Sequence, residues 1–343
     1  MTKTIRVGIT HGDINGVSYE VIMKALSDSR IFDDRTIIVY GSAKAAAFHK
    51  KNLDYQQFVF HQINSATDAH PKRPNLINCV SDDTKVEVGT ETKEAGAAAY
   101  QALEVALKDL ESNAIDVIVT APLNKQTVAM AGYDFTGHTE FFASACNEKN
   151  YLMLLCNNLM RVGVVAAHVP LADVSSYITQ EKVYNKLDIL NKTLQQDFGI
   201  RKPRIAVLGL NPHAGDKGLI GAEEQSVIVP TLEKAREAGI MALGPYPADG
   251  FFGAHEYRGF DAVLGMYHDQ ILTPFKALDF DGAINYTAGL PIIRVSPGHG
   301  TAYDIVGKKI ASEAPLLQSL FAACDIFNTR KQNQQLLKNT LNT

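Results

Sequence analysis

The sequence predicts an α/β fold with a largely parallel sheet, and three observations lead to this class. Short apolar runs rich in Val and Ile alternate with longer amphipathic segments along the 343 residues. Two of the amphipathic segments stop at a glycine, Gly199 and Gly239, as helices commonly do. No Pro/Ser/Gly-rich spacer, low-complexity tract or internal repeat interrupts the alternation. This pattern is typical of parallel sheets whose strands are connected by helices.

The first part of the chain begins with an apolar run, Ile5–Thr10, which reads as a strand. A long alanine-rich segment farther on places Leu103, Leu107 and Leu110 on one face, which is the spacing of a helix. In order, this part predicts strands at 5–10, 36–40 and 116–120 and helices at 17–26 and 92–110.

The middle of the chain continues the same alternation. The segment from Glu181 to Phe198 places Val183, Leu187 and Leu194 on one stripe, as an amphipathic helix does. The expected elements are strands at 151–155, 161–167, 204–210 and 261–265 and helices at 181–198 and 225–238.

The length of the chain indicates more than one domain, because a single core rarely holds 343 residues. Since no linker is visible, two domains would share a continuous sheet or be interleaved. We expect a discontinuous α/β domain over residues 1–130 and 276–343 and a central α/β domain over residues 131–275.

Composition excludes several classes of function. The net charge of -4 gives no reason to expect nucleic acid or an anionic membrane as partner. No stretch approaches the roughly 20 apolar residues that span a bilayer, and no signal-peptide pattern follows the first residues. The scattered cysteines are expected to be buried, reduced thiols of a cytoplasmic protein; they are Cys79, Cys146, Cys156 and Cys324.

Three histidines follow predicted strands, and they are the strongest chemical signal. His168, His213 and His268 each come just after an apolar run. In a parallel sheet, ligands bind beyond the carboxyl ends of the strands. Neutral imidazole is the commonest metal ligand, and three protein ligands with one open position describe a catalytic divalent site. The alternative is that these are ordinary surface or core histidines, because no local motif such as HExxH supports the set.

A second constellation lies at Thr136–Phe142, which reads as the start of a helix. His138 and Thr139 fall in its first turn, where free N–H groups favour an anionic ligand. A simple helix cap is the alternative.

A third constellation lies in the glycine- and proline-punctuated stretch from Lys276 to Thr301, which is expected to form loops. It carries Lys276, Asn285, Arg294 and His299. Lys and Arg in loops can hold a phosphate or carboxylate, and Arg can do so bidentately. Alternatively, they can be solvated surface charges.

Two nucleotide motifs are absent from the sequence. No GxGxxG follows the first strand, and there is no GxxxxGK[ST]. Motif reasoning alone therefore disfavours a Rossmann-type nicotinamide site.

Six short blocks keep their order and spacing over nearly the whole chain and are together far more specific than any one block. They are Gly137–Phe142, His168–Leu171, Gly209–Gly215, Met266–Gln270, Gly289–Pro291 and His299–Ala302. On these blocks the sequence resembles the 4-hydroxythreonine-4-phosphate dehydrogenase family of the vitamin B6 (pyridoxine) pathway.

The resemblance implies an isocitrate/isopropylmalate dehydrogenase-like fold, with two α/β domains on a central mixed sheet, which binds NAD without a Rossmann motif. It also implies a homodimer with the active site at the subunit interface. His168, His213 and His268 would hold a divalent metal (zinc, magnesium, manganese or cobalt), one of them reaching in from the partner. His138, Thr139, Lys276, Asn285 and Arg294 would bind substrate, and Lys276 and Asp249 are the candidate catalytic proton carriers.

The implied reaction is the NAD- or NADP-dependent oxidation of 4-phosphooxy-L-threonine. The 3-keto acid would then decarboxylate to 3-amino-2-oxopropyl phosphate on the route to pyridoxal phosphate. Metal and nicotinamide chemistry account for these residue types, because the ion favours loss of the hydroxyl proton while the nicotinamide takes the hydride.

The chain departs from the family pattern in its loops. The first loop, His11–Glu20, lacks two prolines and a glycine of the family motif. Asn124 stands where His is common, Ile271 where Gly is common, and Gly298 where Asp is common. These positions leave open the exact substrate, including threonate or erythronate phosphates, and the choice between NAD and NADP.

Two other classes of function are compatible with fewer of the residues. A three-His zinc hydrolase or lyase needs only the histidines and leaves Lys276 and Arg294 without a role. A non-enzymatic metal- or metabolite-binding protein would result if the altered first loop had abolished cofactor binding.

Overall fold

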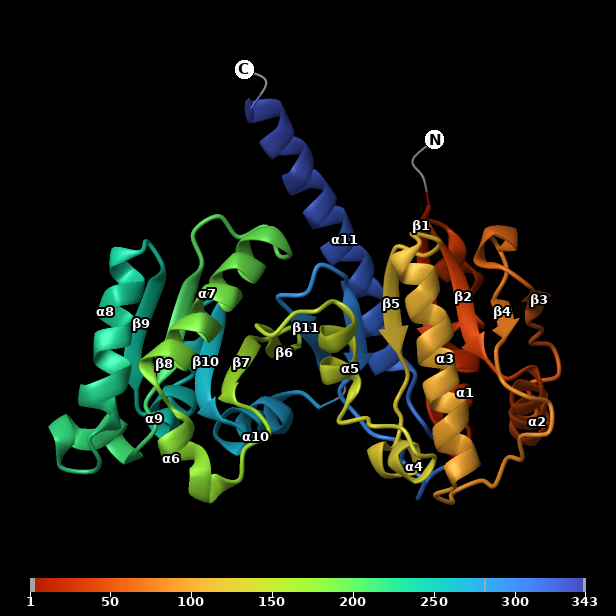
Figure 1. Cartoon of the computed structure of the whole chain (residues 1–343), viewed down its shortest axis with the longest axis horizontal. Coiled ribbons are helices and arrows are strands. Elements are labelled where there is room, and N and C mark those ends of the chain that lie inside the picture. The colour runs from red at the N-terminus through yellow and green to blue at the C-terminus, as the bar shows by residue number, and fades with distance from the viewer. Residues whose placement is uncertain (1–3, 281, 342–343) are drawn as a thin grey trace. The chain divides into compact units, whose positions relative to one another are not determined.

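The α/β class is confirmed by the computed structural model, which describes residues 4–280 and 282–341 (Figure 1). The chain divides into two units. The first comprises residues up to Cys146 together with Ile292–Phe327, and the second comprises Asn147–Pro291 together with the residues from Asn328 onward. The sequence predicted the domain boundaries at 130/131 and 275/276. The corresponding boundaries between the two units lie later along the chain, at 146/147 and 291/292.

The first unit contains a parallel sheet. Its strands are ordered β3-β4-β2-β1-β5-β12, and every adjacent pair is parallel. They are β1 (Ile5–Thr10), β2 (Arg35–Gly41), β3 (His61–Ile63), β4 (Asn75–Asn78), β5 (Val117–Thr120) and β12 (Arg294–Pro297). The helices are α1 (Ser18–Ala25), α2 (Ala43–Leu53), α3 (Lys93–Glu111), α4 (Lys125–Met130) and α5 (His138–Ala145).

Helix α3 illustrates how the sequence builds this unit. Thr92 caps its first turn by accepting from the backbone N–H of Ala95. The buried face is mostly alanine, which lets the helix lie close to its neighbours. At Gly96 the approach is closest, because an added Cβ would lie 2.0 Å from the carbonyl oxygen of Thr127 in α4. Small residues here therefore fix the distance between α3 and α4.

The second unit contains a mixed sheet in the order β11-β6-β7-β10-β8-β9. β11, β6 and β7 are antiparallel, whereas β7, β10, β8 and β9 are parallel. The strands are β6 (Leu152–Cys156), β7 (Arg161–Ala166), β8 (Arg204–Leu208), β9 (Met241–Tyr246), β10 (Ala262–Tyr267) and β11 (Ile284–Ala288). The helices are α6 (Val174–Tyr177), α7 (Gln180–Gln196), α8 (Val229–Glu237), α9 (Ala248–Gly253) and α10 (His268–Leu278), and α11 (Ala314–Leu341) continues into this unit from the first.

The stretch from Lys276 to Thr301 differs from its expected loop character. Lys276 lies in the last turn of helix α10, Asn285 in strand β11 and Arg294 at the start of strand β12. The glycines and prolines of this stretch mark the connections between these elements. The prediction of loops was therefore wrong for these three residues, and each is held by regular secondary structure.

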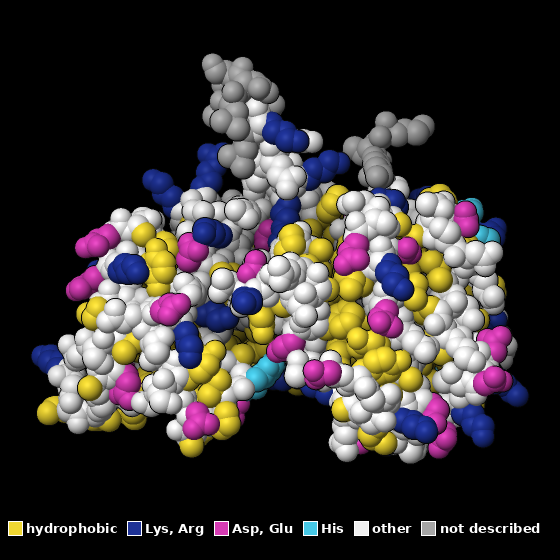
Figure 2. All heavy atoms as spheres, in the orientation of Figure 1, with side chains coloured by type: hydrophobic (Ala, Val, Ile, Leu, Met, Phe, Trp, Pro, Cys, Tyr) yellow, Lys and Arg dark blue, Asp and Glu magenta, His cyan; other side chains and the backbone are white. Residues whose placement is uncertain are grey.

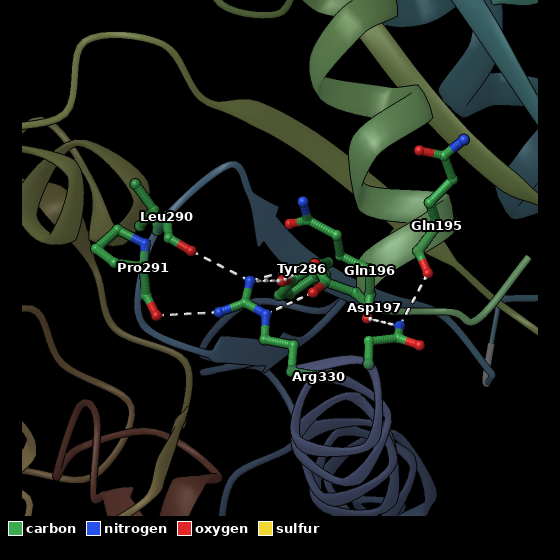
Figure 3. Close-up of polar contacts among 8 residues, drawn as sticks. Gln195, Gln196, Asp197, Tyr286, Leu290, Pro291 and Arg330 are labelled. Atoms are coloured by element: carbon green, nitrogen blue, oxygen red, sulfur yellow. Dashed lines mark hydrogen bonds and ion pairs between the residues drawn. The ribbon is translucent and has the colours of Figure 1, made fainter. Parts of the chain in front are cut away.

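A largely buried polar cluster in the second unit surrounds Arg330 of helix α11 (Figure 3). The guanidinium of Arg330 donates to the carboxylate of Asp197 and to the hydroxyl of Tyr286, and also to the carbonyls of Leu290 and Pro291. The Tyr286 hydroxyl in turn donates to Asp197 at 2.6 Å. Burial raises the pKa of Tyr286 well above its ordinary value, so the phenol stays protonated as this donor. The cluster joins α11, the end of α7 and β11.

The altered first loop is buried rather than exposed. His11, Asp13 and Asn15 are fully buried in the first unit. Asp13 accepts from the Tyr303 hydroxyl at 2.6 Å, and the Asn15 amide donates to the carbonyl of Thr90 at 2.9 Å. This loop, which departs from the family motif, is therefore held by hydrogen bonds inside the unit.

We expect His11 to make the fold sensitive to acid. Its Nε2 donates to the carbonyl of Ala98, and burial lowers its pKa from 6.5 to about 4. Above pH 6.5 the ring is neutral in both the folded and the unfolded chain. As the pH falls from 6.5 toward about 4, the unfolded chain binds a proton at His11 that the folded chain does not, so the free energy of unfolding decreases by up to about 3 kcal/mol. In His11→Gln, whose amide can make the same bond, unfolding by urea should show a weaker loss of stability between these pH values. Equal losses in the variant and the parent would contradict this assignment.

No helix within residues 4–280 and 282–341 is long and apolar enough to cross a membrane. On the face drawn in Figure 2, Lys and Arg side chains are dispersed, with acidic side chains between many of them.

Candidate functional site

The three predicted histidines of the second unit follow three neighbouring parallel strands. β10 pairs with β7 on one side and with β8 on the other. His168 follows β7, His268 begins helix α10 directly after β10, and His213 lies in the turn after β8. All three therefore lie at one edge of the sheet, where open α/β sheets bind ligands.

Two of these rings are close together. The ring centroids of His168 and His268 are 6.5 Å apart. With metal–nitrogen distances of about 2.1 Å, two imidazoles on one ion would have centroids nearer than this, so the two rings are neighbours but not at the separation of bound ligands. Across the described residues, however, no three His, Cys, Asp or Glu side chains gather tightly enough to hold a metal ion.

His268 has the surroundings of an oriented ligand. Its Nδ1 lies 2.6 Å from a carboxylate oxygen of Asp269 in the first turn of α10. In the neutral ring that contact favours the tautomer with the proton on Nδ1 and the lone pair on Nε2, which is how carboxylates orient metal-binding histidines. The donor chemistry of these histidines therefore fits a divalent ion.

His213 is presented by an unusual backbone segment. Residues 213–217 have φ between 39° and 77°, which is a left-handed turn. His213, Ala214, Asp216 and Lys217 are not glycine, and each such residue costs about 1 to 2 kcal/mol in this conformation. Strain of this kind persists only where the surroundings hold it and is concentrated at functional sites.

A separate cluster of charge lies in the first unit. Arg294 is 2% exposed, and its Nε and one terminal nitrogen donate to the Thr120 hydroxyl at 3.1 and 2.7 Å. Burial lowers the pKa of Arg294 to about 9, and the nearby carboxylate of Glu140 only partly opposes this effect. A buried cation of this kind favours an anionic ligand.

Lys125 and His138 extend this cluster. A Cβ added at Gly137 would lie 2.6 Å from Glu140 Oε2 and 3.0 Å from Lys125 Nζ, so both side chains pack against the start of α5. Nε2 of His138 is buried without a hydrogen-bond partner. Burial, and then the positive charges of Arg294 and Lys125, hold the pKa of His138 well below its ordinary value. The ring is thus neutral and can bond a ligand.

The helix start at α5 supports the same chemistry. Gly137 is the N-cap and offers no side chain to the first-turn N–H groups. Thr139, another predicted substrate residue, is 8% exposed in this turn. A helix start with nearby cations is suited to a phosphate or carboxylate.

The remaining predicted residues are placed separately within the second unit. Lys276 is half-buried and lies eight residues, about 12 Å, along α10 from His268. Asn285 has its Oδ1 buried without a partner. Asp249 is exposed in the first turn of α9, directly after β9.

Thr120 and Lys125 were not among the predicted site residues. The end of strand β5 is the signal that could have identified them, because Thr120 ends that strand and Lys125 begins the next helix. Asn124, one of the departures from the family pattern, caps α4 by accepting from the N–H of Gln126 at 2.8 Å. Ile271, another departure, is fully buried, and its side chain would lie 2.9 Å from a Cβ added at Gly265.

The chain is similar to known proteins over most of its length. The model of the family described as "Pyridoxal phosphate biosynthetic protein PdxA" matches residues 33–323. A 4-hydroxythreonine-4-phosphate dehydrogenase of Bacteroides thetaiotaomicron is 49% identical over 338 residues, covering 98% of this chain and 93% of the relative. A putative D-threonate 4-phosphate dehydrogenase of Oceanobacillus iheyensis is 36% identical, covering 96% of this chain and all of the relative.

The fold has a similar counterpart among solved structures. The crystal structure of 4-hydroxythreonine-4-phosphate dehydrogenase from Klebsiella pneumoniae has a TM-score of 0.81 and 30% identity, covering 94% of this chain and all of that chain. The prediction of a dehydrogenase is confirmed at the level of the family. From the family match and the near full-length relatives, the chain belongs to the PdxA family of pyridoxal phosphate biosynthetic proteins.

Proposed function

We propose that the chain oxidises 4-phosphooxy-L-threonine with NAD and a divalent metal, and that the product decarboxylates to 3-amino-2-oxopropyl phosphate in pyridoxal phosphate biosynthesis. The observation that carries the proposal is the buried cation Arg294 beside the start of helix α5 in a chain of this family. In the balanced reaction, C3–OH becomes a ketone as a hydride passes to NAD and one proton is released. Carbon dioxide then leaves C2, and C2 takes up one proton to give the aminoketone.

The first unit carries groups that suit the anionic groups of the substrate. Arg294 and Lys125 supply positive charge, and the first-turn N–H groups of α5 supply hydrogen bonds. Thr139 lies in the same turn. His138 is held neutral, so its unpartnered Nε2 can bond a substrate hydroxyl or amino group without adding charge.

The histidine edge of the second unit carries groups that suit the chemistry at the oxidised carbon. His168, His213 and His268 would hold the divalent ion. An ion bound there would make the substrate hydroxyl more acidic and stabilise the charge that develops on decarboxylation. Lys276 and Asp249 are the proposed proton carriers, and Asn285 offers a buried carbonyl oxygen to the substrate.

A homodimer is part of the proposal. Leu171, next to the His168 segment, is 74% exposed, and Leu219, just after the left-handed turn of His213, is 83% exposed. Large exposed apolar side chains beside a polar site are suited to contact with another chain. A second copy covering this edge would also add ligands, since no three candidate ligand side chains gather among residues 4–280 and 282–341 of one chain.

A substrate panel tests the proposal. Purified protein with NAD and Zn²⁺, Mg²⁺, Mn²⁺ or Co²⁺ should form NADH with 4-phosphooxy-L-threonine, and a chelator should abolish the signal. D-threonate 4-phosphate should be tested in the same panel, because a relative 36% identical to this chain is named a putative D-threonate 4-phosphate dehydrogenase. Preference for threonate phosphate would replace the substrate while keeping the reaction class. No NADH or NADPH with any phosphorylated four-carbon hydroxy acid would reject the function.

A further inference from the structure

Glu224 is a buried carboxylate that the proposed chemistry does not use. It is 1% exposed, at the start of the π-helical segment Glu224–Ile228 before helix α8. It forms no ion pair with Lys or Arg within the described residues. A buried carboxylate needs strong hydrogen-bond donors to be tolerated, and the donors identify what it holds.

The donors all belong to the segment that leads into the left-handed turn of His213. Oε1 of Glu224 accepts from the backbone N–H groups of Leu210 and Asn211, both at 2.7 Å. Oε2 accepts from the side-chain amide of Asn211 at 3.0 Å. Glu224 therefore fixes the backbone at the end of β8 and the side chain two residues before His213.

The same carboxylate is enclosed by two glycines of this segment. A Cβ added at Gly215, inside the turn, would lie 2.5 Å from Glu224 Oε2. A Cβ added at Gly209 would lie 3.1 Å from Oε1. The carboxylate thus contacts both the entry to the turn and its middle, which is the kind of support that a strained backbone requires.

The bonds that the turn makes for itself are few. Ala214 N–H donates to the Asn211 carbonyl at 3.1 Å, and Leu219 and Ile220 N–H close the turn at its end. None of these bonds joins the turn to the body of the unit. The contacts of Glu224 do so, and they reach Asn211, to which Ala214 is bonded.

The segments that follow His168 and His268 are hydrogen-bonded to the same strand end. Glu223 accepts from Asn211 Nδ2 at 2.8 Å and from the hydroxyl of Ser175, which lies in α6 after His168. Gln270, two residues after His268, donates to the carbonyl of Gly209 at 2.6 Å. The strand end that Glu224 holds is therefore the point where all three histidine segments are bonded together.

We infer that Glu224 is a positioning residue, which holds the left-handed turn so that His213 faces the edge it shares with His168 and His268. The inference rests on the proposed metal site. It concerns the preorganisation of that site and assigns Glu224 no contact with metal or substrate.

The test uses Glu224→Gln in the full chain. The new amide keeps the shape and can still accept from Leu210 and Asn211, but it places an NH₂ group against the NH₂ of Asn211. Zinc affinity by calorimetry should weaken about 10- to 100-fold, the usual range for a residue that orients a ligand. In the metal-free protein, hydrogen exchange at the amides of Leu210 and Asn211 should accelerate at least about tenfold, because a neutral amide oxygen is a weaker acceptor than the carboxylate it replaces.

A matched control and a milder variant keep the test decisive. Glu233→Gln makes the same chemical change at an exposed position of α8 and should leave both readouts unchanged. Asn211→Ala removes the side-chain bond and leaves the two backbone bonds, so its loss of zinc affinity should be intermediate. Unchanged zinc affinity and unchanged exchange in Glu224→Gln would overturn the inference. If the unaltered protein binds no zinc, the metal site fails, while the exchange measurement still decides whether Glu224 holds the turn.

Discussion

Replacing His213 with asparagine should abolish tight binding of the divalent ion and lower kcat/KM on the order of 10⁴-fold. Loss of a ligand removes several kcal/mol of transition-state stabilisation, and each 1.36 kcal/mol corresponds to about tenfold in rate. Asparagine is preferred to alanine here because His213 has φ 54° and ψ 28°, a conformation that asparagine adopts readily. The substitution therefore removes the imidazole without adding backbone strain.

The chain offers a closely matched control for this substitution. His255 has φ 57° and ψ 28°, nearly the same conformation, and lies exposed in the same unit with no proposed role. His255→Asn removes an imidazole at equal backbone cost and should retain metal and activity. The measurements are metal content after dialysis, steady-state kinetics and the mass in solution, which should stay that of the parent. Equal activity of His213→Asn with a full complement of metal would reject His213 as a ligand.

The histidine edge was predictable from the sequence because its logic is local. Each of the three histidines follows an apolar run, and parallel strands bring their carboxyl ends to one edge. The order β7-β10-β8, which makes these strands neighbours, depends on pairing between distant segments and leaves no local signal. The left-handed turn could not be predicted from the sequence either. Its residues, His-Ala-Gly-Asp-Lys, include only one glycine, the residue that adopts positive φ most readily.

Other elements escaped prediction because tertiary contacts override their local signals. Helix α10 contains Pro274 and strand β9 contains Pro245, and such residues argue against regular structure. Strand β11 pairs antiparallel with β6, although the alternation along the chain favours parallel pairing. Arg294 was expected in a loop, where solvated charge is ordinary. Its burial in β12 excludes an ordinary solvated surface charge.

Replacing Arg294 with glutamine should lower kcat/KM on the order of 10³-fold, mostly through a higher KM. Removing a buried, hydrogen-bonded charge from a charged contact costs about 4 kcal/mol. Competitive inhibition by inorganic phosphate should weaken in parallel, because phosphate reports on the anion site alone. Zinc binding should be unchanged, since the proposed metal ligands belong to the second unit. Arg30→Gln, at an 84% exposed side chain of the first unit, is the control.

The stability of the same variant separates a functional charge from a structural one. Burial lowers the pKa of Arg294 more than Glu140 raises it, so the charge is held at a cost to the fold. Glutamine can still bond Thr120 and relieves that cost, so Tm should stay the same or rise while the phosphate affinity is lost. Arg294→Lys keeps the charge without the planar fork and should retain part of the affinity. A large fall in Tm with unchanged phosphate inhibition would instead make Arg294 a structural cation, and the anion site would have to be sought elsewhere.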